Sequence, residues 1–170
     1  MGLSAPLVWA DETQTALFAQ QLAACPQARN AVVTLHGDLG MGKTTLVRHL
    51  LRALGVTGRV KSPTYAVVEP HEVPGPEGTL HIWHFDFYRF EDPREWEDAG
   101  FRDLFASPGL KLVEWPQKVG AQLPVADLAI HIQPLDETSR RVRVHAHTLH
   151  GAAWLGAWAA QPMPRTEAPA

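Results

Sequence analysis

The spacing of apolar side chains predicts a helix followed by a buried strand near the start of the chain. Residues 12–25, ETQTALFAQQLAAC, repeat with the helical period, and their large apolar side chains share one face: Leu17, Phe18 and Leu22. Asp11 and Gln14 have the spacing of a capping box, which satisfies backbone N–H groups where a helix begins. The β-branched run AVVTL that follows Asn30 is typical of a buried strand.

The middle of the chain contains a second helical period and a series of strand patterns. The segment LVRHLLRALG is helical and ends at Gly55, a residue typical of C-caps. Runs typical of strands lie at 61–69, which opens with a Ser62–Pro63 turn, and at 79–90, 110–115, 127–132 and 140–149. The last two alternate with period two, so each is expected to have one exposed face. The Pro- and Gly-rich segment 73–78 predicts a loop that joins two strands.

Two short helices complete the predicted elements. Asp92 as N-cap and Pro93 as the first helical residue open one of them, over 92–100. Trp154 and Trp158 are four residues apart, which places both on one face of a helix that closes the fold.

Length and composition agree with a single domain. The chain has 170 residues, 45% of them hydrophobic, so one domain over 1–160 can form a core, followed by a flexible tail over 161–170. A formal net charge of −3 argues against a chain that grips nucleic acid by itself over a wide surface. The single cysteine, Cys25, excludes an intramolecular disulfide. Together with the lack of any signal-peptide or membrane-span pattern, it predicts a cytoplasmic protein.

The most specific chemical signal is the glycine-rich segment from Gly37 to Thr44. Its sequence GDLGMGKT satisfies G-x-x-x-x-G-K-[ST] and lies between a predicted strand and a predicted helix, the context in which this motif binds phosphate. The glycines let backbone N–H groups point at phosphate oxygens, and the helix start adds partial positive charge. Lys43 would bridge the terminal phosphates, and the Thr44 hydroxyl would ligate Mg²⁺.

Two carboxylates are candidates for the metal that accompanies a nucleotide. Asp86 and Glu114 each follow apolar, strand-like residues, at the strand ends where open parallel sheets bind ligands. An unpaired buried carboxylate is costly, so each needs a partner or a solvated position. The structural alternatives are an ion pair with Arg89 for Asp86, and an exposed charge at a strand end for Glu114.

Three weaker signals have more than one interpretation. The segment KSPTY places Ser62 and Thr64 where they could sense a terminal phosphate, but a simple turn would have the same sequence. The basic run 140–143, RRVR, is typical of a solvated strand face, and a contact with a nucleotide base or an RNA backbone is the alternative. A zinc site is disfavoured because no cysteine cluster accompanies the closely spaced histidines, which are His81, His84, His145 and His147.

As an ordered set, the motifs resemble the bacterial TsaE family, formerly YjeE, over about residues 9–145. They are GDLGMGKTT, VKSPTYAVVEP, HFDFYR, DPREWEDAGFRDLF and LVEWP. That family is the ATPase component of the machinery that makes threonylcarbamoyladenosine in tRNA. The resemblance implies an α/β fold similar to P-loop NTPases, with three layers, a mainly parallel central sheet and additional antiparallel strands.

The resemblance also implies cofactors and partners. These are ATP with Mg²⁺, and the TsaB–TsaD complex, which completes the modification of adenosine 37 in ANN-decoding tRNAs. TsaC would act upstream, and tRNA would be met indirectly, through the complex. No contact with a membrane is implied.

The resemblance also implies roles for individual residues at the matching positions of this sequence. Those implied to wrap the phosphates are Leu39, Gly40, Met41, Gly42, Lys43, Thr44 and Thr45. Thr44 and Glu114 would hold Mg²⁺ and Asp86 would support the metal or its water, so Lys43, Asp86 and Glu114 are the implied catalytic residues. The switch-like segment is matched by Ser62, Pro63, Thr64 and Tyr65, the family's conspicuous tryptophan by Trp115, and the contacts to base or ribose by Glu12 and Arg140.

Three other functions are alternatives to an ATPase. A small-molecule kinase should have an Arg-rich lid and a base for the acceptor hydroxyl, and neither pattern is evident. A GTPase should have the guanine-reading sequence N-K-x-D, which does not occur. A nucleotide-gated adaptor would bind ATP with little turnover; Glu114, which could hold the metal or orient water, favours hydrolysis instead.

Overall fold

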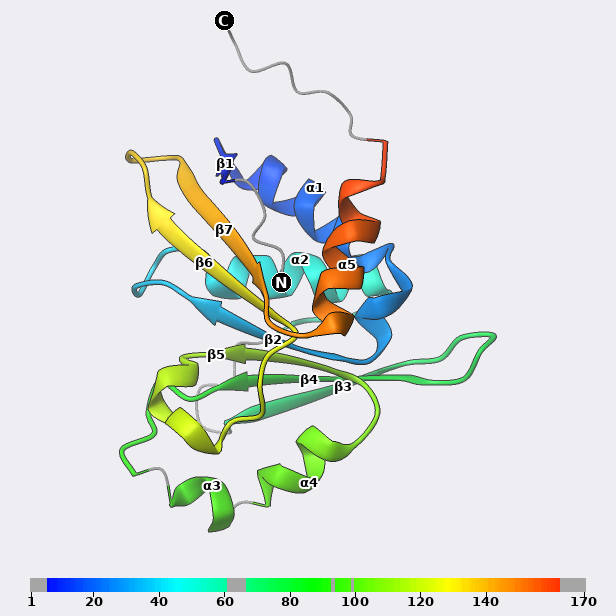
Figure 1. Cartoon of the computed structure of the whole chain (residues 1–170), viewed down its shortest axis with the longest axis vertical. Coiled ribbons are helices and arrows are strands. Elements are labelled where there is room, and N and C mark those ends of the chain that lie inside the picture. Colours follow the sequence, from blue (N-terminus) through cyan, green and yellow to red (C-terminus); the bar gives the residue numbers. More distant parts are fainter. Residues whose placement is uncertain (1–5, 61–66, 93, 99, 163–170) are drawn as a thin grey trace, which may run out of the picture.

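One seven-stranded sheet organises the chain, as the computed structural model shows for residues 6–60, 67–92, 94–98 and 100–162 (Figure 1). The strand order is β1-β7-β6-β2-β5-β4-β3. The strands are β1 (Leu7–Trp9), β2 (Ala31–His36), β3 (Val68–Val73), β4 (Leu80–Asp86), β5 (Leu110–Glu114), β6 (Leu128–Pro134) and β7 (Arg140–Ala146). Strands β6, β2, β5 and β4 run parallel, whereas β1, β7 and β3 pair antiparallel at the edges. The predicted mixed α/β fold is confirmed.

Helices cover both faces of the sheet and make the fold three-layered (Figure 1). One face carries α1 (Glu12–Ala23), α2 (Lys43–Leu54) and α5 (Leu149–Ala159). The other carries α3 (Glu95–Asp98) and α4 (Phe101–Ala106) beneath β3, β4 and β5. Three short 3₁₀ helices, η1 (Pro26–Arg29), η2 (Pro116–Lys118) and η3 (Gly120–Gln122), lie in the connections.

The larger hydrophobic core lies under α1, α2 and α5. Buried side chains from these helices, among them Phe18, Leu46 and Trp154, pack on the inward residues of β2, β6 and β7. Trp154 also donates a 3.1 Å hydrogen bond from its indole nitrogen to the carbonyl of Leu22, so α5 is tied to α1 by a polar contact as well as by packing. The predicted closing helix is therefore an integral part of the core.

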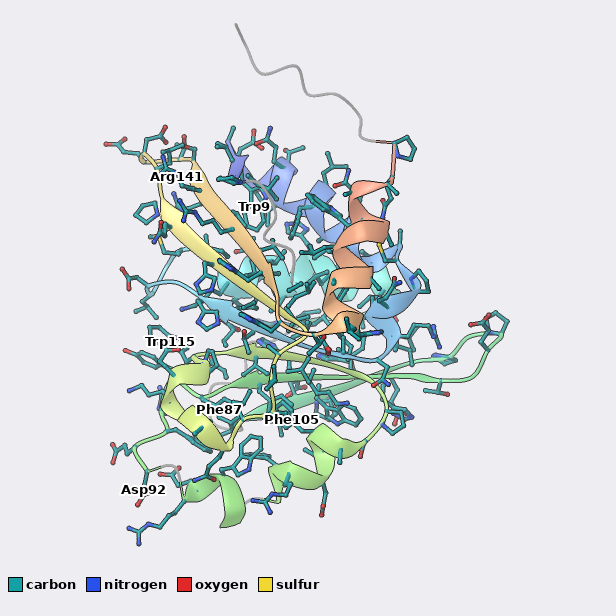
Figure 2. All side chains as sticks on the ribbon, in the orientation of Figure 1. Trp9, Phe87, Asp92, Phe105, Trp115 and Arg141 are labelled. Carbon is teal, nitrogen blue, oxygen red and sulfur yellow. The ribbon has the colours of Figure 1, made fainter. Side chains whose placement is uncertain are left out.

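An aromatic cluster fills the second face of the sheet. Phe85 and Phe87 from the β4 segment meet Trp96 of α3 and Phe105 of α4, with ring centroids 4.6 Å apart for Phe85 and Phe105 (Figure 2). All four side chains are buried. This packing fixes the position of β4, whose last residue is Asp86.

Several predicted boundaries are wrong. The 79–90 strand ends at Asp86, because Phe87 and Phe90 turn into the aromatic cluster; Phe90 N–H bonds the carbonyl of Phe87 at 2.9 Å. The predicted 92–100 helix is reduced to the single turn of α3, and Pro93 lies outside the described residues. Helix α4 was not predicted. Strand β6 does not alternate strictly, since Ala129 on its outward face is also buried.

The other helix predictions are confirmed. Asp11 is the N-cap of α1, and its carboxylate accepts from the Gln14 N–H at 3.3 Å. Gln14 reaches back to the amide of Ala10 rather than to the cap residue itself. Gly55 closes α2 in the left-handed conformation. Within the described part of the chain, no helix is long and apolar enough to cross a membrane.

Candidate functional site

The glycine-rich loop joins β2 to α2 at the carboxyl edge of the parallel strands. Gly37 must be glycine there, since a Cβ at its position would lie 2.7 Å from the carbonyl oxygen of Ile132. Gly42 has φ +100°, a left-handed conformation that favours glycine, and it directly precedes α2. No side chain caps the start of α2, so its first backbone N–H groups are open to an anion.

Lys43, the first residue of α2, turns its side chain back over the loop. Its ammonium group donates to the carbonyl of Gly37 and lies 3.7 Å from the ring centroid of Trp115. Burial lowers the pKa of Lys43, and the nearby charges of Glu114, Asp86 and Asp38 oppose that shift. The two groups that contact this buried ammonium group are a carbonyl and an aromatic ring, both neutral. The ammonium group can therefore bind an anionic group such as a phosphate.

Asp86 and Glu114 end two neighbouring parallel strands and face each other in the sheet register. Their predicted place at strand ends is confirmed. Glu114 is only 2% exposed, so the alternative of an exposed strand-end charge is wrong. One oxygen of Glu114 accepts a 2.9 Å hydrogen bond from the Thr44 hydroxyl, and the other lies 2.5 Å from His84 Nε2.

Asp86 is half-buried beside this pair. Its carboxylate accepts from the backbone N–H of Tyr88 at 3.0 Å. Burial raises the pKa of Asp86, and the charge of Glu114 raises it further, while the Tyr88 N–H, His84 and Lys43 act in the opposite direction. Two carboxylates this close favour a bound cation between them.

Trp115 adopts an unusual backbone conformation that the sequence did not predict. Its φ of 56° makes it the only non-glycine residue with positive φ in the described part of the chain. Such strain in a bulky residue clusters at functional sites. The indole ring lies beside Tyr88, with ring centroids 5.0 Å apart, and beneath the Lys43 ammonium group, at the strand ends (Figure 2).

His84 is a second residue whose role the sequence did not reveal. It was considered only as a zinc ligand, and the structure instead places its fully buried ring against Glu114. The available signal was positional: His84 is two residues before Asp86, so on a strand the two side chains share a face.

Two adjoining pockets surround the loop. One, of about 290 Å³, brings together the loop, the acidic pair and the aromatic residues: Leu39, Gly40, Gly42, Lys43, Thr44, Thr45, Asp86, Tyr88, Glu114 and Trp115. The other, of about 240 Å³, joins the loop to the first turn of α1 and the start of β7: Trp9, Asp11, Glu12, Thr15, Gly40, Met41, Gly42, Thr45, Thr138 and Arg140. Glu12 and Arg140, 128 positions apart in the chain, are therefore brought to one pocket beside the phosphate loop.

Most of the predicted site residues thus converge on one edge of the sheet. Arg140 donates to the carbonyls of Ser139 and Asp136, at 3.0 and 3.4 Å, and Glu12 lies 3.0 Å from His49 Nε2. The switch-like residues Ser62, Pro63, Thr64 and Tyr65 lie outside the described residues.

The donor atoms at the acidic pair are all oxygens. Thr44 supplies a hydroxyl, and Glu114 and Asp86 supply carboxylates, a set that suits Mg²⁺. Among the described residues, no group of three or more His, Cys, Asp or Glu side chains is arranged to hold a metal ion by itself. Mg²⁺ is usually bound through one or two carboxylates together with substrate phosphates, so these oxygens fit that ion when a nucleotide is present.

Comparison with known proteins points to one family. The sequence model described as "Threonylcarbamoyl adenosine biosynthesis protein TsaE" matches residues 9–142. The chain is 41% identical to the tRNA threonylcarbamoyladenosine biosynthesis protein TsaE of Haemophilus influenzae over 131 residues, which cover 77% of this chain and 80% of the relative. The Bacillus subtilis protein of the same name is 39% identical over 111 residues, 65% of this chain and 66% of the relative. The crystal structure of Bacillus subtilis YdiB superposes with a TM-score of 0.74 and 25% identity, covering 94% of this chain and 97% of that one.

Proposed function

Because this chain belongs to the TsaE family, we propose that it is a P-loop ATPase of tRNA threonylcarbamoyladenosine biosynthesis. It binds and hydrolyses Mg-ATP to support repeated threonylcarbamoylation of adenosine 37 in ANN-decoding tRNAs by the TsaB–TsaD complex. TsaC acts upstream, tRNA is reached through the complex, and the work takes place in the cytoplasm.

The observation that carries this proposal is the contact between Thr44 and Glu114. It joins the hydroxyl at the start of α2 to a buried carboxylate at the end of β5, directly beside the uncapped helix N-terminus. In P-loop NTPases, a hydroxyl in this position and an acidic residue on a neighbouring strand serve the nucleotide's metal. A loop that bound only a free anion would not need the acidic partner.

Each residue then has a defined task. The N–H groups of the loop and of the first turn of α2 receive the phosphates, and Lys43 exchanges its contact with Gly37 for a phosphate oxygen. Thr44 and Glu114 would hold Mg²⁺, with Asp86 supporting the metal or its water, and the bound ion would supply positive charge to the transferring phosphoryl group. Trp115 and Tyr88 form the aromatic wall at this end of the pocket.

The second pocket is proposed to receive the nucleoside. Glu12 and Arg140 both line a space that Gly40, Gly42 and Thr45 of the loop also line. Carboxylate and guanidinium groups can accept from and donate to ribose hydroxyls and base edges.

A nucleotide-binding and turnover assay on the purified chain tests this proposal. Titration with fluorescent ATP, ADP and GTP analogues, with and without Mg²⁺, should show metal-strengthened binding of the adenine nucleotides. Slow release of phosphate from ATP should accompany it and disappear in Lys43→Ala. Metal-dependent binding without turnover would favour a nucleotide-gated adaptor, and turnover that needs a small-molecule acceptor would favour a kinase.

A further inference from the structure

The contact between His84 and Glu114 lies deeper than the proposed metal site and is not accounted for by it. The ring of His84 is 0% exposed and the carboxylate of Glu114 is 2% exposed. His84 Nε2 is 2.5 Å from Glu114 Oε2, while the other carboxylate oxygen faces the Thr44 hydroxyl. The two oxygens of Glu114 therefore have different partners, one behind it in the core and one at the pocket.

Strand register explains how the histidine reaches this position. Asp86 of β4 is opposite Glu114 of β5, and His84 is opposite Leu112. His84 thus lies one pleat behind the two acidic residues on the same face of the sheet. From there it can contact Glu114 diagonally without lining the pocket of about 290 Å³ that Glu114 does line.

A histidine at this buried position leaves a polar ring atom without a hydrogen bond. Within the described part of the chain, the second ring nitrogen, Nδ1, is buried without a hydrogen-bond partner. On its own face and strand His84 is flanked by Ile82 and Asp86, and the residue opposite it on β5 is Leu112; an aromatic hydrocarbon at this position would leave no orphan nitrogen. The polar contact that His84 does make is the one to Glu114. We therefore expect this contact to be the reason that a histidine occupies the position.

We propose that His84 is a positioning residue that fixes the orientation of the Glu114 carboxylate, so that one oxygen is kept turned toward Thr44 and the metal-binding end of the pocket. Partners of this kind behind a metal-binding carboxylate usually change metal affinity by about 10- to 100-fold when they are removed. The inference rests on the proposed function, because it assumes that Glu114 serves the metal of a nucleotide.

The test separates metal-dependent from metal-independent binding. The affinity of a fluorescent ADP analogue is measured with Mg²⁺ and with EDTA in wild type, His84→Phe and His84→Gln. In His84→Phe, which keeps ring volume but lacks the contact, the strengthening by Mg²⁺ should fall by about 10- to 100-fold. The affinity in EDTA should stay within about twofold of wild type. His84→Gln, whose amide N–H can reach Glu114, should retain most of the strengthening.

A matched substitution controls for the loss of a buried imidazole. His71 lies on the adjacent strand β3, and its Nε2 is also buried without a hydrogen-bond partner among the described residues. His71→Phe makes the same chemical change at a residue that does not line the pocket of Glu114, and it should leave the effect of Mg²⁺ unchanged. Thermal unfolding of all variants shows which are folded; if His84→Phe is not, His84→Asn, whose shorter side chain cannot reach Glu114, takes its place.

Combination with a Glu114 variant decides whether His84 acts through that carboxylate. In a Glu114→Gln background, His84→Phe should have no further effect on the Mg²⁺-dependent part of the affinity. Equal losses with Mg²⁺ and with EDTA, or additive effects in the double variant, would overturn the inference and leave a structural role. Wild type without any Mg²⁺ effect would overturn the proposed function as well, whereas a strong Mg²⁺ effect that survives His84→Phe would overturn this inference alone.

Discussion

Thr44 and Glu114 are 70 positions apart in the sequence, and a 2.9 Å hydrogen bond joins their side chains. The contact connects the first turn of α2 to the last residue of β5, which pairs with the central strand β2. It brings the hydroxyl of the phosphate-loop motif together with a buried carboxylate at the carboxyl edge of the sheet.

Removal of the Glu114 carboxylate should abolish turnover while nucleotide binding persists. Glu114→Gln keeps the shape of the side chain but loses the charge that would hold the metal, so we expect phosphate release to fall by about 100-fold or more. Affinity for ADP in EDTA should change little. Phosphate-release and fluorescence titrations measure the two effects, with Glu72→Gln on the exposed β3–β4 hairpin as control. Full turnover in Glu114→Gln would contradict the assignment.

Arg140, which lines the second pocket, should contribute to nucleoside binding. Arg140→Ala removes a guanidinium that lines this pocket together with Glu12, so ATP affinity should fall by about fivefold to tenfold, the usual loss for a solvated polar contact. Arg143→Ala, which changes an exposed residue three positions further along β7, should have no such effect. Inorganic phosphate affinity should be the same in both variants, since neither residue lies at the phosphate end. Equal losses in the two variants would exclude a specific role.

Two glycines in α5 should respond in opposite ways to alanine. A Cβ at Gly151 would lie 1.9 Å from the carbonyl oxygen of Asp127, so Gly151→Ala must displace the helix and should cost about 2–4 kcal/mol of unfolding free energy. Gly156 has nothing within 4 Å of such a Cβ, and Gly156→Ala should stabilise the helix by about 0.5–1 kcal/mol. Chemical denaturation of the two variants measures the contrast. Similar effects would show that α5 does not pack as the structure has it.

The pH dependence of stability should show that one half-buried histidine, His36, is neutral in the folded state. Burial lowers the pKa of His36 to about 4, assisted by the charges of His131, Lys43, His147 and His145. An unfolded histidine titrates near 6.5, so between pH 6.5 and pH 4 the unfolded chain binds more protons, and stability falls as the pH falls. The free energy of unfolding of wild type, relative to His36→Gln, should decrease by up to about 3 kcal/mol across this window. A midpoint near pH 6.5 for His36 in an NMR titration of the folded protein would contradict this prediction.

Local patterns in the sequence were sufficient for most of the secondary structure and for the phosphate loop. The period of α1, its Asp11 cap and the buried run of β2 are local properties, and each was predicted correctly. The segment after Asp86 was not, because its aromatic residues look like a continuing strand. Their destination, a cluster with α3 and α4, depends on residues 10 to 20 positions further along the chain.

The candidate site was predictable where a residue type carries its own chemistry and unpredictable where a contact defines its role. Lys43 and Thr44 belong to a motif, and Asp86 and Glu114 are acidic residues at the ends of apolar runs. The role of His84 depends on the register of β4 with β5, and the left-handed conformation of Trp115 has no signature in its neighbours. Glu12 was found only through family resemblance, and Arg140 had beside the resemblance only the weak signal of the basic run 140–143, since no motif marks either residue.

The central claim is that this chain drives repeated cycles of a tRNA-modifying complex by hydrolysing ATP. The measurement that tests it most directly is the number of threonylcarbamoyladenosine residues formed per TsaB–TsaD complex, followed together with phosphate release, with wild type or Lys43→Ala added. We predict many turnovers and accelerated phosphate release with wild type, and about one turnover with Lys43→Ala. Equal multiple turnover with the two proteins, or multiple turnover without any ATP hydrolysis, would contradict the account.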